Sequence, residues 1–173
     1  MAFAIYFDPH MLLYSMDAVG ARLLCPADDW RLWLATADVL QLNAIEFSTL
    51  CNIAELPVEP FHESAMEIIL QLRAVNRTTV APWALIRTAH DSVDVYFEYG
   101  DQWLHEKRVV AAAPIPHPAY TVGCRDAFGA GVFSILLRSW GAQGLLSGLD
   151  LCIHWAKEKT HVLGLLLTLE EKA

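Results

Sequence analysis

The sequence lacks several features that would mark a particular class of protein. Its four cysteines lie far apart and form no CxxC pair, so neither a zinc knuckle nor a disulfide framework is indicated. Basic residues are scarce: 12 Lys and Arg stand against 20 Asp and Glu, which gives a net charge of −8. This balance argues against a general nucleic-acid binder, because such proteins need clustered Lys and Arg.

Signals for secretion or membrane insertion are also missing. The first residues, MAFAIYFDPH, contain no basic segment and reach Asp8 too early for a signal peptide. No apolar run continues for the roughly eighteen residues that a membrane span needs, because Asp150, His154 and Lys157 interrupt the apolar C-terminal region. We therefore expect a cytoplasmic protein with neither a membrane partner nor a nucleic-acid partner.

Apolar residues, by contrast, are abundant. They make up 55% of the 173 residues, and the mean hydropathy is +0.33. The length fits one domain with a sizeable core. Such a composition indicates either a sheet that is buried on both faces or an apolar surface that a partner covers.

Short apolar runs alternate with amphipathic segments along the chain. The runs FAIYFD, DVLQLN and TTVAPWALIRTA predict strands, with Pro82 marking either an edge strand or the entry to a strand. The segments DDWRLWLATA, AIEFSTLCNIAEL and HESAMEIILQLRAV predict helices. SVDVYFEYGDQWLHEKRVV predicts a hairpin that turns at Gly100-Asp101. This alternation predicts an α/β fold with a largely parallel sheet.

The stretch AYTVGCRDAFGAGVFSILL, residues 119–137, places a glycine-containing turn before an apolar helix. The first turn of a helix offers N–H groups without an acceptor in the helix, and the helix dipole is positive there. Asp126 at this position could cap the helix or accept a proton from an attacking hydroxyl. The residues alone leave both a plain helix start and an anion-binding turn open.

The same stretch resembles the late signature of the PfkB or ribokinase family of carbohydrate kinases, approximately D-T-x-G-A-G-D-x-F-x-x-G. The matching positions are Thr121, Gly123, Asp126, Phe128 and Gly131. Upstream, DVLQLNAIEF is similar to the family's strand followed by N-x-x-E. The start FAIYFDPH and the tail LDLCIHWAKEKTHVLG are similar to an earlier strand and to the closing helix with the strand after it.

The resemblance implies a ribokinase-like three-layer α/β/α sandwich with a mostly parallel sheet. Family members are nearly twice as long, so residues 1–173 correspond to one kinase domain without its N-terminal substrate and lid half. An open sheet edge would then need cover. We therefore expect either a homo-oligomer or a missing N-terminal half as the partner.

The chemistry implied by the resemblance is phosphoryl transfer from ATP, with Mg²⁺, to a sugar or sugar-phosphate hydroxyl. Asp126 would be the catalytic base, and the backbone from Gly123 to Asp126 would form an anion hole for the transferred group. Asn43 and Glu46 would hold Mg²⁺ through water. Without the resemblance, Asn43 is equally well a turn or cap residue, and Glu46 an exposed carboxylate in a first helical turn.

The sequence departs from the family pattern in several places, and Tyr120 stands where the signature begins with Asp. Cys124 and Arg125 replace the Ala-Gly of the anion hole, and Thr88 and Asp91 stand where a turn near the nucleotide carries glycines. The Arg125 guanidinium would either contact a phosphate or point to solvent beside a damaged site. A pseudokinase that senses nucleotide or binds proteins is therefore the alternative to a kinase. An unrelated α/β binding domain with a coincidental motif is a third reading.

Overall fold

The computed structural model describes residues 5–7, 9, 14–16, 18–19, 22–24, 29–75, 82–89, 91–110 and 123–170, with side chains of the last helix as far as Lys159. The chain divides into two compact units, residues 1–109 and 110–173, and each is described by itself. The expected connector AAAPIPHPAY and the Tyr120 and Thr121 positions of the motif lie outside the described residues.

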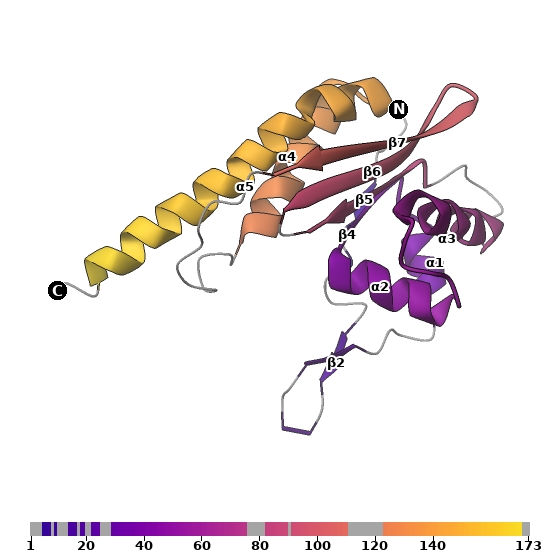
Figure 1. The fold of residues 1–173 in the computed structure, drawn as a ribbon, viewed down its shortest axis with the longest axis horizontal. Coiled ribbons are helices and arrows are strands. Elements are labelled where there is room, and N and C mark those ends of the chain that lie inside the picture. Colours follow the sequence, from indigo (N-terminus) through magenta and orange to yellow (C-terminus); the bar gives the residue numbers. More distant parts are fainter. Residues whose placement is uncertain are drawn as a thin grey trace. The chain divides into compact units, whose positions relative to one another are not determined.

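The first unit is built on a five-stranded sheet in the order β1-β4-β5-β6-β7. Figure 1 labels β4 to β7 of this sheet. The strands are β1 (Tyr6–Phe7), β4 (Val39–Asn43), β5 (Ala84–Thr88), β6 (Ser92–Tyr99) and β7 (Gln102–Val109). The helices are α1 (Trp30–Leu34), α2 (Ala44–Ile53) and α3 (Phe61–Val75). The predicted α/β class is confirmed, and each predicted strand and helix of this unit has its counterpart.

The sheet is mixed because its connections differ in length. β1, β4 and β5 are parallel and are joined through helices, whereas β5–β6 and β6–β7 pair antiparallel. The β6–β7 turn at Gly100-Asp101 has only two residues, and Gly100 has φ 62°. A turn this short can join only antiparallel strands and favours positive φ. Pro82 precedes β5, an inner strand, so it marks the entry to a strand and the expected edge position is wrong.

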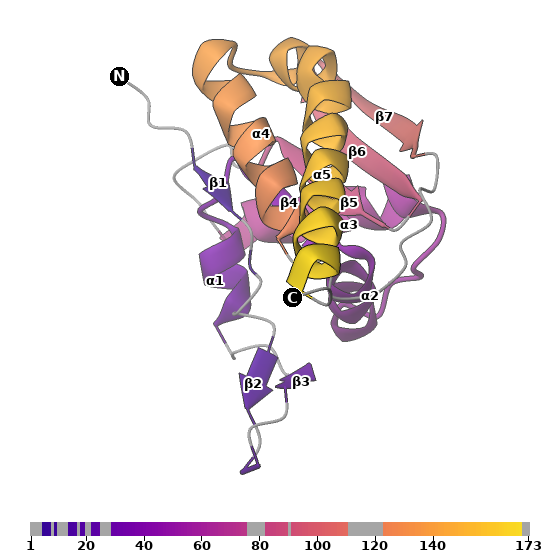
Figure 2. The same cartoon turned by 90° about the vertical axis from the view of Figure 1, so that its left-hand side faces the viewer.

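A further antiparallel ribbon, β2 (Tyr14–Met16) with β3 (Arg22–Leu24), has no counterpart among the predicted elements. Figure 2 shows its two strands side by side, separate from the larger sheet. Each strand has only three residues, which is too short for a period-two pattern to be recognised in the sequence. For this reason the ribbon could not be predicted from the sequence.

Strands β4, β5 and β6 are buried along almost their whole length, as the high apolar content predicts. One face carries Leu40, Leu85 and Tyr96 in register and packs with the apolar sides of α1, α2 and α3. Phe47 of α2 and Phe61 of α3 meet there with ring centroids 5.0 Å apart. Full burial of each such side chain contributes about 1.5–3 kcal/mol to folding.

Helix α2 ends in a Schellman motif with a strained residue. The N–H of Leu56 donates to the carbonyl of Cys51 at 2.8 Å, and the N–H of Glu55 donates to that of Asn52 at 3.3 Å. This arrangement places Glu55 at φ 56°, in the left-handed region that glycine normally occupies. A residue with a Cβ is destabilised in this conformation.

Replacing Glu55 with Gly is therefore expected to raise the free energy of unfolding by about 0.5–1 kcal/mol, because Gly adopts positive φ without strain. Urea denaturation followed by circular dichroism measures the change. Glu55→Ala is the control, since Ala keeps the Cβ and should give no comparable gain. Equal stability of the wild type and Glu55→Gly would show that the turn is not strained.

The second unit is a pair of antiparallel helices, α4 (Cys124–Arg138) and α5 (Ala142–Glu170), joined by residues 139–141. Glycines permit the two helices to pack closely. A Cβ on Gly131 would lie 3.0 Å from Cys152 Sγ, and a Cβ on Gly148 would lie only 2.1 Å from Ile135 Cδ1. The expected strand after the closing helix is wrong, because α5 continues to Glu170. Its leucine-rich end contains no proline that would stop a helix. Among the helices of the described residues, none contains an apolar stretch that could span a membrane.

Candidate functional site

The predicted glycine turn lies at the start of α4. Gly123 is the N-cap residue, with φ 80° and ψ −3°, and its carbonyl accepts a hydrogen bond from the N–H of Ala127 at 2.9 Å. The left-handed conformation explains why glycine stands here. A Cβ at this position would also lie 3.2 Å from Cε of Lys159 on α5. Both the positive φ and the closeness of Lys159 therefore favour glycine at position 123.

The residues after Gly123 form the first turn of the helix. Cys124 and Arg125 are half-buried, whereas Asp126 is exposed and is the acidic residue of this turn. The α4 cap is made by the Gly123 backbone without a side-chain hydrogen bond, so Asp126 does not act as the N-cap residue. A carboxylate therefore lies at the positive end of the α4 helix dipole. This group faces solvent and can meet a substrate.

Asn43 and Glu46 lie in the first unit, where β4 passes directly into α2. The Asn43 Oδ1 accepts a hydrogen bond from the N–H of Glu46, and Glu46 Oε2 accepts one from the N–H of Asn43, both at 2.8 Å. This reciprocal pair is a capping box. The interpretation of Asn43 as a cap is confirmed. The interpretation of Glu46 as an exposed carboxylate is wrong, since its side chain is fully buried.

These two residues stand at the carboxyl end of a parallel strand. In open α/β sheets, ligands bind in the crevice at the carboxyl ends of the strands. Asn43 pairs in register with Thr88 at the end of β5, so two polar residues share this edge. The described residues contain no group of three or more His, Cys, Asp or Glu side chains that could hold a metal ion. A role for Asn43 and Glu46 in holding Mg²⁺ stays a prediction.

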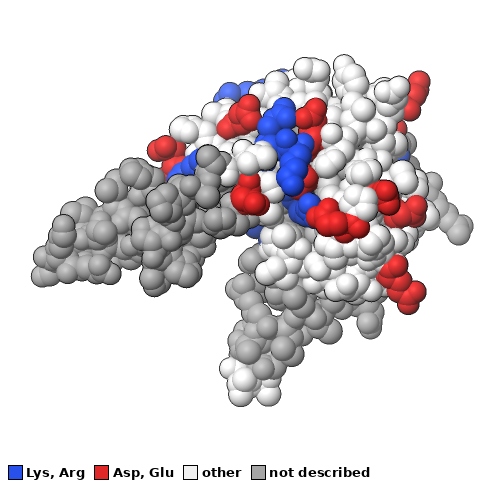
Figure 3. All heavy atoms as spheres, viewed as in Figure 1, with Lys and Arg blue, Asp and Glu red and all other residues white. Residues whose placement is uncertain are grey.

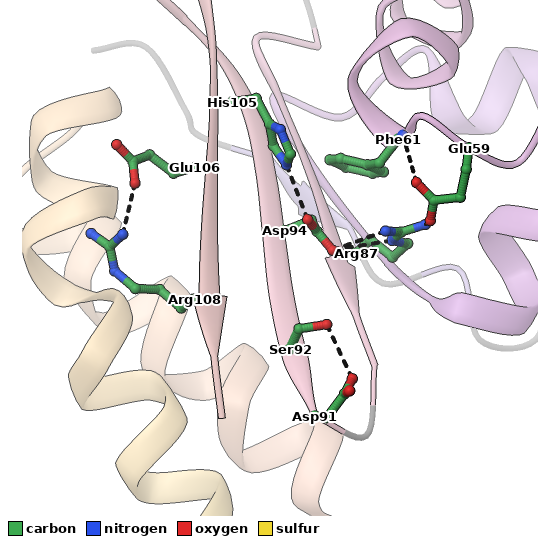
Figure 4. Close-up of polar contacts among 9 residues, drawn as sticks. All are labelled: Glu59, Phe61, Arg87, Asp91, Ser92, Asp94, His105, Glu106 and Arg108. Atoms are coloured by element: carbon green, nitrogen blue, oxygen red, sulfur yellow. Dashed lines mark hydrogen bonds and ion pairs between the residues drawn. The ribbon is translucent and has the colours of Figure 1, made fainter. Parts of the chain in front are cut away.

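The turn between β5 and β6 forms without the glycines of the family pattern. Thr88 ends β5 and donates its hydroxyl to the carbonyl of Leu42 at 3.3 Å. The N–H of Ala89 donates to the carbonyl of Ser92 at 2.8 Å, and the Ser92 hydroxyl contacts Asp91 Oδ1 at 3.2 Å (Figure 4). Asp91 therefore adds a carboxylate to a turn whose backbone is already closed by hydrogen bonds.

The predicted site residues thus form two groups. Gly123, Cys124, Arg125 and Asp126 make one continuous turn in the second unit, and Asn43 with Glu46 makes a hydrogen-bonded pair in the first. The first group begins helix α4, and the second forms the capping box of helix α2.

A charged cluster inside the first unit was not predicted from the sequence. Arg87 donates to Asp94 Oδ2 at 3.0 Å and to Glu59 Oε1 at 2.6 Å, and His105 Nε2 lies 3.0 Å from Asp94 Oδ1 (Figure 4). Arg87 and Asp94 are 8% and 1% exposed. Burial acts to lower the pKa of Arg87, but the hydrogen bonds to Glu59 and Asp94 outweigh it and raise that pKa above its ordinary value. The guanidinium therefore stays charged and ties the loop before α3 to the sheet.

On the surface, charges of both signs are interleaved. Figure 3 shows basic side chains in a narrow band with acidic side chains beside it on the face in view. Two ion pairs in the first unit join Arg73 to Glu98 at 2.6 Å and Arg108 to Glu106 at 2.7 Å. The Arg108–Glu106 pair is the more exposed of the two, and pairs of that kind contribute about 0–1 kcal/mol to stability.

The sequence matches no family profile and no curated protein. Among solved structures, it is similar to the sulfate complex of a pyrophosphate-dependent kinase in the ribokinase family, with TM-score 0.58 and 11% identity over 89% of this chain and 46% of that chain. It is also similar to a pyrophosphate-dependent myo-inositol-1 kinase, with TM-score 0.57 and 11% identity over 88% and 46%. An adenosine kinase from Anopheles gambiae gives TM-score 0.46 and 20% identity over 74% and 34%.

The similarities to the two pyrophosphate-dependent kinases, whose TM-scores exceed 0.5, show the fold. The chain has the α/β fold of ribokinase-family small-molecule kinases, as the sequence predicted, and it spans less than half the length of the first two neighbours.

Proposed function

We propose that the chain is the phosphoryl-transfer portion of a ribokinase-type kinase that acts on a sugar or sugar-phosphate hydroxyl, with ATP as donor. The observation that carries this proposal is the turn at the start of α4, where a left-handed Gly123 is followed within the first helical turn by the exposed Asp126. A glycine turn opening a helix suits a phosphate, and a carboxylate beside it suits the hydroxyl that attacks it.

In the proposed reaction, Asp126 accepts the proton of the acceptor hydroxyl as its oxygen attacks the terminal phosphorus of the donor. The backbone from Gly123 to Asp126, at the positive end of α4, stabilises the charge on the transferred group. Such transfers proceed through a loose transition state, so positioning and electrostatics supply most of the catalysis. The glycine turn would provide both at one place.

Asn43 and Glu46 would hold Mg²⁺ at the carboxyl end of β4. Their amide and carboxylate oxygens are the hard ligands that this ion prefers, and contact through water suits its reluctance to lose hydration. The bound ion would neutralise donor phosphate charge. In the chain itself, the buried capping box fixes the orientation of Glu46.

Glu46→Gln separates a metal role from a capping role. Gln at the third helical position also completes a capping box, so the free energy of unfolding should change by less than about 1 kcal/mol. Loss of the negative charge should weaken Mg²⁺-dependent donor binding by about tenfold or more. Calorimetric titration of ATP with and without Mg²⁺ measures the effect. An unchanged Mg²⁺ dependence in a stable variant would restrict Glu46 to the capping box.

Because the chain spans less than half the length of its structural neighbours, we propose that the active kinase includes a further N-terminal half or a second copy of this chain. Within the described residues, β1 pairs only with β4, so one edge of the sheet can accept another strand. Size-exclusion chromatography with light scattering tests self-association. A strictly monomeric chain would leave the separate N-terminal half as the partner.

Cys124, Arg125, Thr88 and Asp91 favour a pseudokinase as the second candidate, since they replace small residues of the family pattern. The two hypotheses predict different turnover. A kinase consumes the phosphoryl donor when a sugar is added, whereas a pseudokinase does not. The neighbours named as pyrophosphate-dependent kinases make inorganic pyrophosphate a necessary second donor in this assay. Sugar-dependent consumption of either donor by the whole chain would exclude the pseudokinase.

A further inference from the structure

We infer that β7 is a self-association edge, at which a second copy of this chain adds its own β7 antiparallel and extends the sheet. β7 is the last strand of the five-stranded order, and among the described residues it pairs with β6 alone. The pairing runs from Gln102 to Val109 without a bulge or a proline. A long, regular edge strand offers a row of backbone groups to another strand. Because this edge is the opposite one from β1, the inference does not rest on the proposed function.

Alternate residues of β7 direct their backbone groups away from β6. The two-residue turn at Gly100-Asp101 makes the residues on either side of it a hydrogen-bonded pair, and such pairs recur at every second position. The N–H and C=O groups of the even-numbered residues from 102 to 108 therefore bind β6. In agreement, the N–H of Glu98 on β6 points the other way and donates to the carbonyl of Trp83 at 2.9 Å. The backbone groups of the odd-numbered residues from 103 to 109 point outward, where a second strand can bind them.

The charged side chains of β7 match a second copy in one register. Charges at a sheet edge normally keep other strands away. A twofold axis at Lys107, however, places Glu106 opposite Arg108 of the second copy, in a pair whose side chains lie close because it is not hydrogen-bonded. Within one copy Glu106 binds Arg108 at 2.7 Å, and the two side chains remain 42% and 36% exposed. The dimer therefore joins four charges of alternating sign, and this complementarity favours a second copy over an unrelated strand.

The same register covers an exposed apolar side chain. Val109 is 80% exposed, and in the dimer it faces the exposed His105 of the second copy. Backbone pairing of residues 105, 107 and 109 adds about six hydrogen bonds across the axis. The unfavourable contact is that of Lys107 with its symmetry mate, since like charges directly opposite each other destabilise a strand pair. We therefore expect a dissociation constant in the micromolar range.

Charge reversal on β7 tests the inference by sedimentation equilibrium of the whole chain. Glu106→Arg and Arg108→Glu should each raise the dissociation constant by about tenfold or more, because each places like charges opposite one another twice. An equimolar mixture of the two variants should form a heterodimer, since the new arginine of one variant then faces the new glutamate of the other. Lys107→Thr should dimerise more tightly than the wild type. Glu67→Arg, at an exposed position of α3, is the control and should dimerise like the wild type.

The outcomes of this test are independent of donor binding. A folded wild type that stays monomeric up to about 1 mM, far above the expected dissociation constant, overturns the inference and leaves the proposed function standing. Equal dimerisation of the wild type, Glu106→Arg and Arg108→Glu also overturns it, because the contact would then lie elsewhere. A mixture of the two variants that forms no heterodimer, with both folded by circular dichroism, overturns the register. Failure of ATP or pyrophosphate to bind a dimeric chain would overturn the proposed function alone.

Discussion

Replacing Asp126 with Asn is expected to lower the rate of sugar-dependent donor consumption by at least about 100-fold, because the variant has no group to accept the hydroxyl proton. Asp126 is exposed in the first turn of α4, so a neutral residue of the same shape should not disturb the helix pair. Donor binding should survive, since the Gly123 turn is unchanged. The measurement is release of ADP or phosphate by the whole chain across a set of sugars and sugar phosphates.

Asp150→Asn is the control for this change. Asp150 is also exposed and lies in the other helix of the same unit, so the net charge changes equally without touching the turn. Its turnover should equal that of the wild type. Turnover that persists in Asp126→Asn would mean that another group is the base, and the mechanism proposed for α4 would be wrong.

Replacing Asp94 with Ala is expected to lower the free energy of unfolding by about 3–5 kcal/mol. Asp94 is 1% exposed and accepts two hydrogen bonds from Arg87, whose guanidinium also lies 4.6 Å from the centroid of the Phe61 ring. Removal of the carboxylate leaves a buried cation with Glu59 as its remaining partner, and Glu59 is 63% exposed. Urea denaturation of the variant measures the loss.

Two further variants test whether the loss arises from the buried charge. Glu106→Ala removes a carboxylate from a more exposed ion pair and should cost less than about 1 kcal/mol. The double variant Arg87→Met with Asp94→Leu removes both charges and should recover much of the stability lost in Asp94→Ala. A small effect of Asp94→Ala would show that Arg87 is adequately solvated, and the cluster would then not hold the loop before α3.

The elements predicted best are those in which apolar spacing and turn residues indicate the same secondary structure. HESAMEIILQLRAV has helical spacing throughout and forms α3, and the Gly100-Asp101 turn lies between two strand-like runs and forms the β6–β7 hairpin. The junction of DVLQLN with AIEFSTL was also predictable, because Asn43 ends an apolar run immediately before a helical one. In these segments, the spacing of apolar residues and the residue types in the turns are sufficient to predict the secondary structure.

Other features depend on contacts between distant residues. The burial of Glu46 and the pairing of Arg87 with Asp94 and Glu59 follow from strand register and loop packing, which single-sequence periodicity does not contain. Likewise, Lys159 is far from Gly123 in sequence, and only the antiparallel packing of α4 and α5 brings them into contact. The length of α5 was underestimated because its apolar end matches the composition of a strand as well as that of a helix.

The candidate site was predictable to the extent that it follows a motif. The sequence indicated a glycine turn before a helix, and the structure adds the left-handed conformation of Gly123 and the exposure of Asp126. The chemical roles of Asn43, Glu46 and the α4 turn remain predictions that depend on the resemblance to ribokinase-type kinases.

The most direct test of the proposed function is calorimetric titration of ATP, with and without Mg²⁺, and of pyrophosphate into the purified whole chain. The proposal predicts saturable binding of at least one donor, with ATP binding strengthened by Mg²⁺. A folded chain that binds neither donor under any of these conditions would contradict it, and the turn at Gly123 would then be an ordinary helix start.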